Sequence, residues 1–127
     1  MVDGFGELGR LMMMNNTDYR INTNRRTIAM YELTQDGTTL VTGCFSNIML
    51  VGEKDGKLYV WLERGLTKTD FYTGKQIPRE ESEEKTYKFC TIGTGWSYQP
   101  SAIGMYIGSV IMNNGLVWHV FMKEVEK

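Results

Sequence analysis

One histidine and two cysteines are the side chains of this 127-residue sequence that could form a nucleophilic pair. His119 lies between Val117 and Phe121 in a strand-like run, and Cys44 and Cys90 each lie in another such run. A catalytic thiol must be made acidic by its position, whereas a thiol buried in a strand is usually inert. A histidine flanked by apolar residues is more typical of a core or an interface. We therefore expect no catalytic residues, and a cysteine-dependent hydrolase that uses Cys90 and His119 is the weaker alternative.

Metal binding and carboxylate chemistry have little support in the sequence. Metal sites need several His, Cys or carboxylate ligands close together, and the single His with two distant Cys does not meet this requirement. The stretch PREESEEK, residues 78–85, is rich in glutamate. Carboxylates act in acid–base catalysis only when a cleft shifts their pKa values, and a charge run in a polar loop is normally a solvated face. We expect neither a metal nor a cofactor.

The segment FCTIGTGWSYQP, residues 89–100, contains a glycine-flanked corner at the end of a strand-like run. Glycines let backbone N–H groups approach a ligand closely, and the hydroxyl of Thr94 could add a contact, as in many phosphate sites. Phosphate loops normally open onto a helix N-terminus, but no helical pattern follows Gly95. The favoured interpretation is that Gly93 and Gly95 supply positive φ or space at a strand end.

Several aromatic residues lie in or beside the two long loops of the sequence. Such rings are enriched at interfaces and in ligand pockets, although they could instead cap a small core. If both loops lie at one end of the domain, they would frame a single recognition surface with the glycine corner at its base. The residues expected to bind a ligand or partner are Gly93, Thr94, Gly95, Trp96, Tyr98, Tyr72, Tyr106 and His119.

The chain after residue 26 has the pattern of an all-β protein. Runs rich in β-forming residues alternate with turn signals, and no helical stripe of 3.6-residue period is present. The predicted strands span residues 27–34, 38–45, 47–53, 57–64, 86–93, 105–112 and 116–123. The pairs Asp55-Gly56 and Asn114-Gly115 predict hairpins with two-residue type I′ turns.

This pattern predicts a small antiparallel β-sandwich or barrel of about seven strands with two long loops. Residues 27–127 are expected to form a single β-domain, and residues 1–26 a flexible N-terminal arm. Residues 64–85 form the longer predicted loop. The last strand is apolar on both faces, with Trp118 and Val120 on one side and Phe121 on the other. It must be covered by a second sheet and by a loop or another subunit.

Composition excludes several classes of function. The formal net charge is −1, with 14 basic and 15 acidic side chains, so there is no long-range attraction to nucleic acid or anionic lipid. Arg20, Arg25 and Arg26 beside Tyr19 are too few charges to define a nucleic-acid site. No apolar run is long enough to span a bilayer, and no export signal is recognisable. We expect no membrane or nucleic-acid partner, and reduced thiols in a cytoplasmic protein.

The last third of the sequence contains a set of specific motifs. A strand ends in Gly93–Gly95, Pro100 follows in a loop, Tyr106–Gly108 reads YIG, and Asn114–Phe121 reads NGLVWHVF. Together with Trp61 in a central strand, this pattern resembles a family of short bacteriophage and prophage proteins known only as a domain of unknown function. The resemblance is specific over the C-terminal third and weaker back to about residue 27.

The resemblance implies a phage-type accessory protein that acts in the cytoplasm of a bacterial host, without known catalytic residues. Members commonly have His after Gly-Thr-Gly where this chain has Trp96, so a histidine-based activity at the corner is not carried over. We expect a non-enzymatic protein that binds a host protein or a small charged ligand such as a signalling nucleotide, for example to inhibit host defence. The alternative outside the enzymes is a structural or assembly component that forms a homo-oligomer.

Overall fold

The computed structural model describes residues 24–126, and nearly all of their regular structure is β-strand. The strands are β1 (Arg26–Leu33), β2 (Thr38–Gly43), β3 (Phe45–Lys54), β4 (Lys57–Gly65), β5 (Thr67–Thr69), β6 (Gln76–Pro78), β7 (Lys85–Gly93), β8 (Met105–Ile111) and β9 (Val117–Val125). Two single turns of helix occur among these residues, the 3-10 turn η1 (Glu81–Glu83) and α2 (Pro100–Ile103). Within residues 24–126 no helix is both long and apolar enough to span a membrane. The predicted all-β class is confirmed.

The chain divides into two compact units. The larger unit contains residues 26–66 and 79–126, and the described part of the smaller unit contains residues 24–25 and 67–78. This described part is the β5–β6 hairpin together with Asn24 and Arg25, which hydrogen-bond to β5. The predicted flexible arm lies mostly outside the described residues; β1 already begins at Arg26. That residues 27–127 form a single domain stays a prediction.

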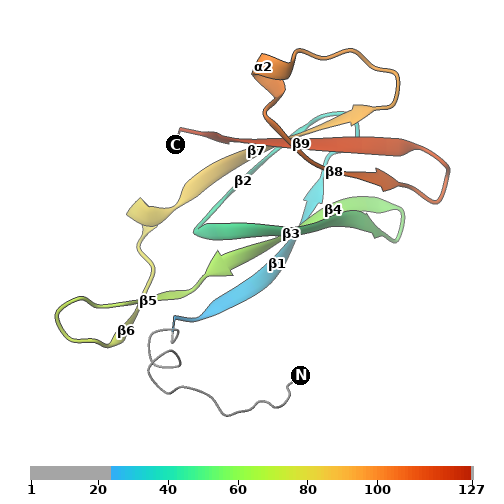
Figure 1. Ribbon diagram of the computed structural model, residues 1–127. Helices are drawn as coiled ribbons and strands as arrows, with labels where there is room; N and C mark the ends of the chain where they lie inside the picture. Colours follow the sequence, from blue (N-terminus) through green and yellow to red (C-terminus); the bar gives the residue numbers. More distant parts are fainter. Residues whose placement is uncertain (1–23, 127) are drawn as a thin grey trace, which may run out of the picture. The chain divides into compact units, whose positions relative to one another are not determined.

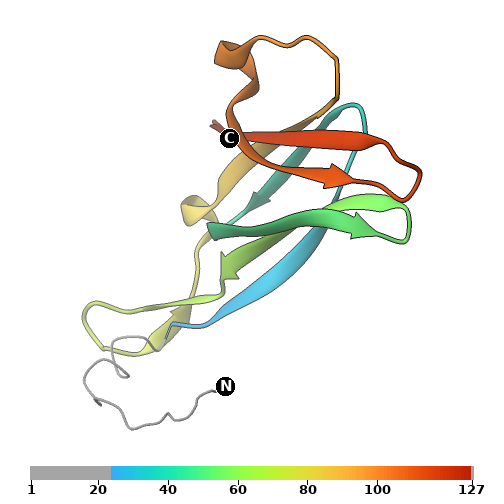
Figure 2. The ribbon, with the colours of Figure 1, turned by 45° about the vertical axis from the view of Figure 1, so that its right-hand side comes forward.

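Two antiparallel sheets make up the larger unit (Figure 1). One has the strand order β1-β4-β3 and the other β2-β7-β9-β8. Strands β3 and β8 lie side by side, as Figure 2 shows, but no hydrogen-bonded ladder joins them. The sheets therefore form a sandwich and not a closed barrel.

The core lies between the two sheets and follows from alternation along their strands. Leu58, Val60 and Leu62 of β4 are fully buried, and they face Phe89 of β7 and Val120 of β9 across the sandwich. Residues between them on β4 point outward because successive strand side chains alternate between faces. On β7, Phe89 and Thr91 are two residues apart, so they share a face, and both are buried.

The β3–β4 turn is the one the sequence predicted. Asp55 has φ 53° and Gly56 has φ 78°, as a two-residue type I′ turn requires. The predicted strand over residues 38–45, in contrast, is too long: β2 ends at Gly43, and Phe45 already begins β3 in the other sheet. A side chain on Gly43 would come within 2.8 Å of the Phe45 ring. Glycine therefore leaves space for this ring at the point where the chain passes from one sheet to the other.

The predicted loop over residues 64–85 is also wrong in part, because it contains two more strands and a helical turn. Strands β5 and β6 pair in register from Thr67 with Pro78 to Thr69 with Gln76. Their short length and their polar, exposed residues give almost no apolar alternation, which is the signal by which strands are recognised in a sequence. With these two strands, the described part of the chain has nine.

Candidate functional site

The β8–β9 hairpin positions His119 and sets which residue faces it. Met112 and Leu116 close the turn, with the Gly115 N–H donating to the Met112 carbonyl at 2.9 Å. Gly115 has a positive φ of 90°, whereas the φ of Asn114 is not positive. The predicted two-residue type I′ turn is therefore wrong, and the loop is a three-residue one of the type I plus bulge class. Its register places Ser109 opposite His119.

A β-bulge in β8 then brings Tyr106 to the same face. The pairing shifts between Tyr106 and Gly108, so that Tyr106 lies opposite Phe121 while Gly108 lies opposite Val120. Without the extra residue, Ile107 would occupy the position of Tyr106 on this face. Bulges commonly re-aim side chains in this way. As a result, Tyr106, Ser109 and His119 lie together on the side of the sheet away from the core.

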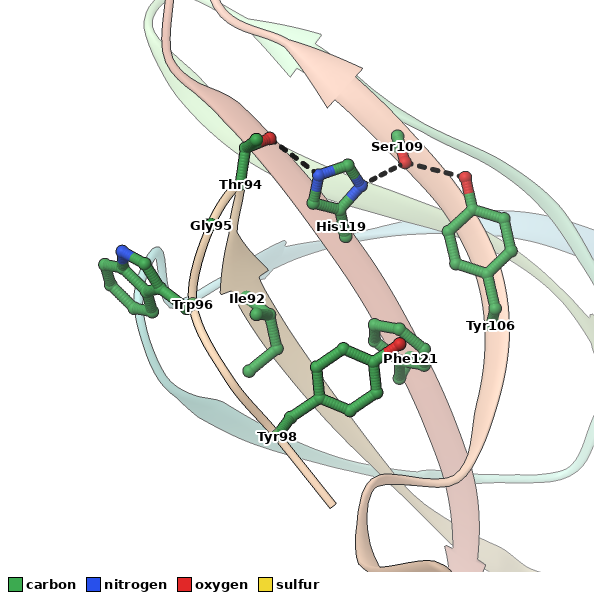
Figure 3. A pocket seen from close by; sticks show the side chains of 10 residues that line it. Ile92, Thr94, Gly95, Trp96, Tyr98, Tyr106, Ser109, His119 and Phe121 are labelled. Carbon is green, nitrogen blue, oxygen red and sulfur yellow. Dashed lines mark hydrogen bonds between the residues drawn. The ribbon is translucent and has the colours of Figure 1, made fainter. Parts of the chain in front are cut away.

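The glycine corner supplies the fourth polar side chain and one aromatic ring. The Trp96 N–H donates to the Gly93 carbonyl at 3.1 Å, and Gly95 has φ 91° at the third position of this turn. A side chain on Gly93 would come within 3.0 Å of the Trp96 ring. The favoured interpretation of the corner therefore fits both glycines: Gly95 has the positive φ, and Gly93 leaves space for Trp96. The turn directs Thr94 toward β9 (Figure 3).

The four polar side chains form a continuous line of hydrogen bonds (Figure 3). Thr94 Oγ1 lies 2.8 Å from His119 Nε2, and His119 Nδ1 lies 2.7 Å from Ser109 Oγ. Ser109 Oγ lies 2.6 Å from the Tyr106 hydroxyl oxygen. Each hydroxyl can either donate or accept, so the direction of the line follows the imidazole tautomer.

Counting hydrogens along this line shows what it can offer a ligand. Three hydroxyls and a neutral imidazole carry four N–H or O–H hydrogens, and the three bonds use one each. With the hydrogen on His119 Nε2, the Thr94 hydroxyl hydrogen remains available. With the hydrogen on Nδ1, the available hydrogen moves to the Tyr106–Ser109 end. The line thus presents one free donor, and its position depends on the tautomer.

Aromatic rings wall the hollow in which this line lies. The cavity has a volume of about 430 Å³ and is lined by Ile92, Gly93, Thr94, Gly95, Trp96, Tyr98, Tyr106, Ser109, His119 and Phe121. The ring centroids of Tyr98 and Tyr106 lie 5.1 Å and 5.5 Å from that of Phe121. Phe121 is thereby covered on the outer face of β9, as predicted, by residues of the loop and of β8.

None of the ten described residues that line this cavity is Asp, Glu, Lys or Arg. His119 bonds only to hydroxyl groups there, whereas a catalytic histidine is typically oriented by a carboxylate. The two cysteines are unpaired, and Cys90 Sγ lies 3.7 Å from Thr38 Oγ1. Within the described part of the chain no cluster of three or more potential metal ligands occurs. The cysteine-dependent hydrolase remains an untested prediction.

Seven of the eight residues predicted to bind a ligand line this one cavity. The eighth, Tyr72, lies at the tip of the β5–β6 hairpin in the smaller unit, where its ring contacts Phe71 at 5.4 Å. That the two loops frame a common surface stays a prediction. Three of the lining residues were not predicted as site residues: Ile92, Ser109 and Phe121. Ser109 could have been found from the hairpin register, had the turn been assigned a three-residue loop.

Comparisons with known proteins identify a matching family model. A family model described as a domain of unknown function, DUF7352, matches residues 24–127. Searches among curated proteins and among solved structures found no significant match.

Proposed function

The chain belongs to the DUF7352 family of domains of unknown function, and we propose that it is a non-enzymatic binding protein. The walled cavity at the glycine corner is its binding site. Its target is a host protein or a small ligand, and the resemblance to phage and prophage proteins supports an accessory role in a bacterial host, for example inhibition of defence. The protein acts in the host cytoplasm.

The observation that carries this proposal is the exposure of large rings around a formed hollow. Trp96 is 48% exposed, Tyr98 47% and Tyr106 55%, whereas Phe121 behind them is 8% exposed. Rings of this size have much apolar surface to bury, and they are enriched where a partner or ligand removes it from water. A volume of about 430 Å³ is also within the usual range for small-molecule sites.

The polar groups of the cavity favour binding over catalysis. Thr94, on one nitrogen of His119, is a neutral partner and cannot stabilise the imidazolium that forms when a histidine takes a proton from a nucleophile. Ser109, on the other nitrogen, is also bonded to Tyr106. Such a line of neutral groups can orient and satisfy a bound molecule without activating an attacking atom.

The cavity is lined without Asp, Glu, Lys or Arg, and this limits the chemical groups that it can bind. A phosphate or carboxylate buried without a cationic partner carries a large desolvation cost. If the target is a charged molecule such as a nucleotide, its ring enters and its charged group stays in water. If the target is a protein, an aromatic or apolar side chain enters.

Purification of the protein from its host, followed by mass spectrometry of released small molecules and retained proteins, tests the proposal. We expect a molecule that is retained by the wild type and lost in Tyr98→Ala. Leu40→Ala is the matched control, since Leu40 is an exposed apolar side chain on β2. Retention that is equal in all three proteins, or absent from all three, would refute a binding role for the cavity.

A second candidate function is assembly, and one surface favours it. The outer face of the β1-β4-β3 sheet exposes Ile28, Met30 and Leu50 around Trp61. Contiguous apolar surface on a sheet often marks a protein interface. Light scattering separates the two functions. An oligomer that dissociates in Met30→Glu would support assembly through this face, whereas a wild-type protein that is monomeric at all concentrations would exclude it.

A further inference from the structure

The line of hydrogen-bonded side chains in the cavity can bind the edge of a ring that carries both a hydrogen-bond donor and an acceptor. In either tautomer of His119 it offers one free donor hydrogen at one end and hydroxyl lone pairs at the other. A ligand edge that carries both an acceptor and a donor satisfies these groups, and the line can reverse its direction to suit the order of the two. A hydrocarbon ring would leave them without partners, which is costly once water is excluded.

The aromatic walls match a flat molecule. The rings of Tyr98 and Tyr106 lie at interplanar angles of 49° and 64° to the ring of Phe121, and Figure 3 shows the two tyrosines projecting from different segments beside it. Planar heterocycles stack on such rings regardless of their identity, because each has a π-face. Because no Asp, Glu, Lys or Arg is among the ten lining residues, the ring, and not an attached phosphate, is the part that is bound.

We propose that the cavity recognises the uncharged planar heterocycle of a nucleobase-like molecule, stacked on Tyr98 and Tyr106 and read at its edge by the Thr94–His119–Ser109–Tyr106 line. This inference rests on the proposed binding function and specifies its ligand class. Binding selects one tautomer of His119, because the ligand's donor and acceptor fix which end of the line keeps the free hydrogen.

Calorimetric titration of the full chain with four ribonucleosides and their monophosphates tests the ligand class. At least one nucleoside should bind, and its monophosphate should bind with an affinity within about threefold, since the phosphate stays in water. Toluene, a ring without a polar edge, should bind at least about tenfold more weakly than that nucleoside. N-acetyl-tyrosinamide represents an aromatic protein side chain.

Variants and a spectroscopic signature test the contacts. Tyr98→Ala should weaken nucleoside binding by about 5- to 100-fold through loss of stacking, and Ser109→Ala by about tenfold through interruption of the line. Ser101→Ala is the control for Ser109→Ala, because Ser101 is an exposed serine in α2 outside the cavity. Nitrogen NMR of His119 should change from averaged tautomers to one tautomer on binding, and Ser109→Ala should abolish this change.

The outcomes separate this inference from the proposed function. A monophosphate that binds more than about tenfold tighter than its nucleoside would overturn the uncharged ligand class but leave a binding function. Preferential binding of N-acetyl-tyrosinamide would do the same and indicate a protein partner. Nucleoside binding unaffected by Tyr98→Ala would place the ligand elsewhere and overturn the inference. If none of these probes binds, and the purified wild type retains no molecule that is absent from purified Tyr98→Ala, both the inference and the proposed binding function are refuted.

Discussion

Gly104 joins α2 to β8 and holds the loop that carries Trp96 and Tyr98, so its replacement is a direct test of the structure. Its φ of 98° and ψ of −157° lie in a region that is essentially restricted to glycine. A Cβ at this position would also overlap the Met122 carbonyl oxygen and lie 2.7 Å from the Met122 carbonyl carbon. Both atoms belong to the backbone of β9, which cannot move without disturbing the sheet.

The two effects of Gly104→Ala can be estimated separately. Backbone strain in this region costs about 1–3 kcal/mol, and overpacking against a rigid neighbour adds about 1–3 kcal/mol. The free energy of unfolding should therefore fall by about 2–6 kcal/mol, a large part of the 5–15 kcal/mol typical of a domain. Gly115→Ala is the matched control, because Gly115 has a similar φ of 90° and no atom within 4 Å of the added Cβ. It should lose only about 1–2 kcal/mol.

Urea unfolding followed by tryptophan fluorescence measures both variants against the wild type. Linear extrapolation gives the free energy of unfolding, and unchanged m-values would show that only stability differs. Because the loop after the corner is anchored at Gly104, we also expect Gly104→Ala to lose ligand retention that Gly115→Ala keeps. If the two variants lose the same stability to within about 0.5 kcal/mol, the close approach of Gly104 to β9 is not as described.

Three further predictions concern the fold. Thr91→Val should cost about 1–3 kcal/mol of unfolding free energy in thermal or urea unfolding, because the buried hydroxyl donates to the Thr34 carbonyl at 2.7 Å and accepts from the Gly37 N–H at 3.0 Å; an unchanged midpoint would contradict this. Phe89→Ala, at a fully buried core position, should cost about 3–5 kcal/mol, and an effect below about 1 kcal/mol would mean that the sheets do not pack around it. Hydrogen bonds from Ser46 at 2.7 Å and Asn47 at 2.8 Å, and then the Arg26 charge, lower the pKa of Glu63 below its usual range. Ionised Glu63 therefore stabilises the folded protein at pH values above its pKa in the unfolded chain, which is about 4.3. This stabilisation is lost as the pH falls through the lower pKa that Glu63 has in the folded protein. The stability difference between wild type and Glu63→Gln should shrink over that range, and a difference independent of pH would refute the assignment.

The sequence alone was sufficient for the all-β class, most strand positions and the β3–β4 turn. These depend on local properties: the alternation of apolar residues along β4 and β7, and the tolerance of Asp55-Gly56 for positive φ. It also placed the aromatic loop and the glycine corner together, because both lie within one short segment of chain. The short strands β5 and β6 were missed since their residues carry no alternation.

Which residues line the cavity depends on the pairing register between β8 and β9, and only the tertiary structure decides this register. A two-residue turn at Asn114-Gly115 would pair Ser109 with Val120, one position away from the observed pairing with His119. An Asn-Gly sequence is compatible with either loop length, and the observed turn is held by a distant contact, the Asn113 N–H donating to the Glu53 carboxylate of β3 at 2.8 Å.

The bulge beside Gly108 also lies against a strand that is distant in the sequence. A side chain on Gly108 would lie 2.6 Å from Val51 Cγ2 of β3, so β8 approaches the neighbouring sheet closely at this point. The bulge turns Tyr106 toward Phe121 and Ser109. Local propensity thus specified which segments are strands, whereas packing between the two sheets selected the register that assembles the polar line, because a shift of one residue reverses the face of every side chain.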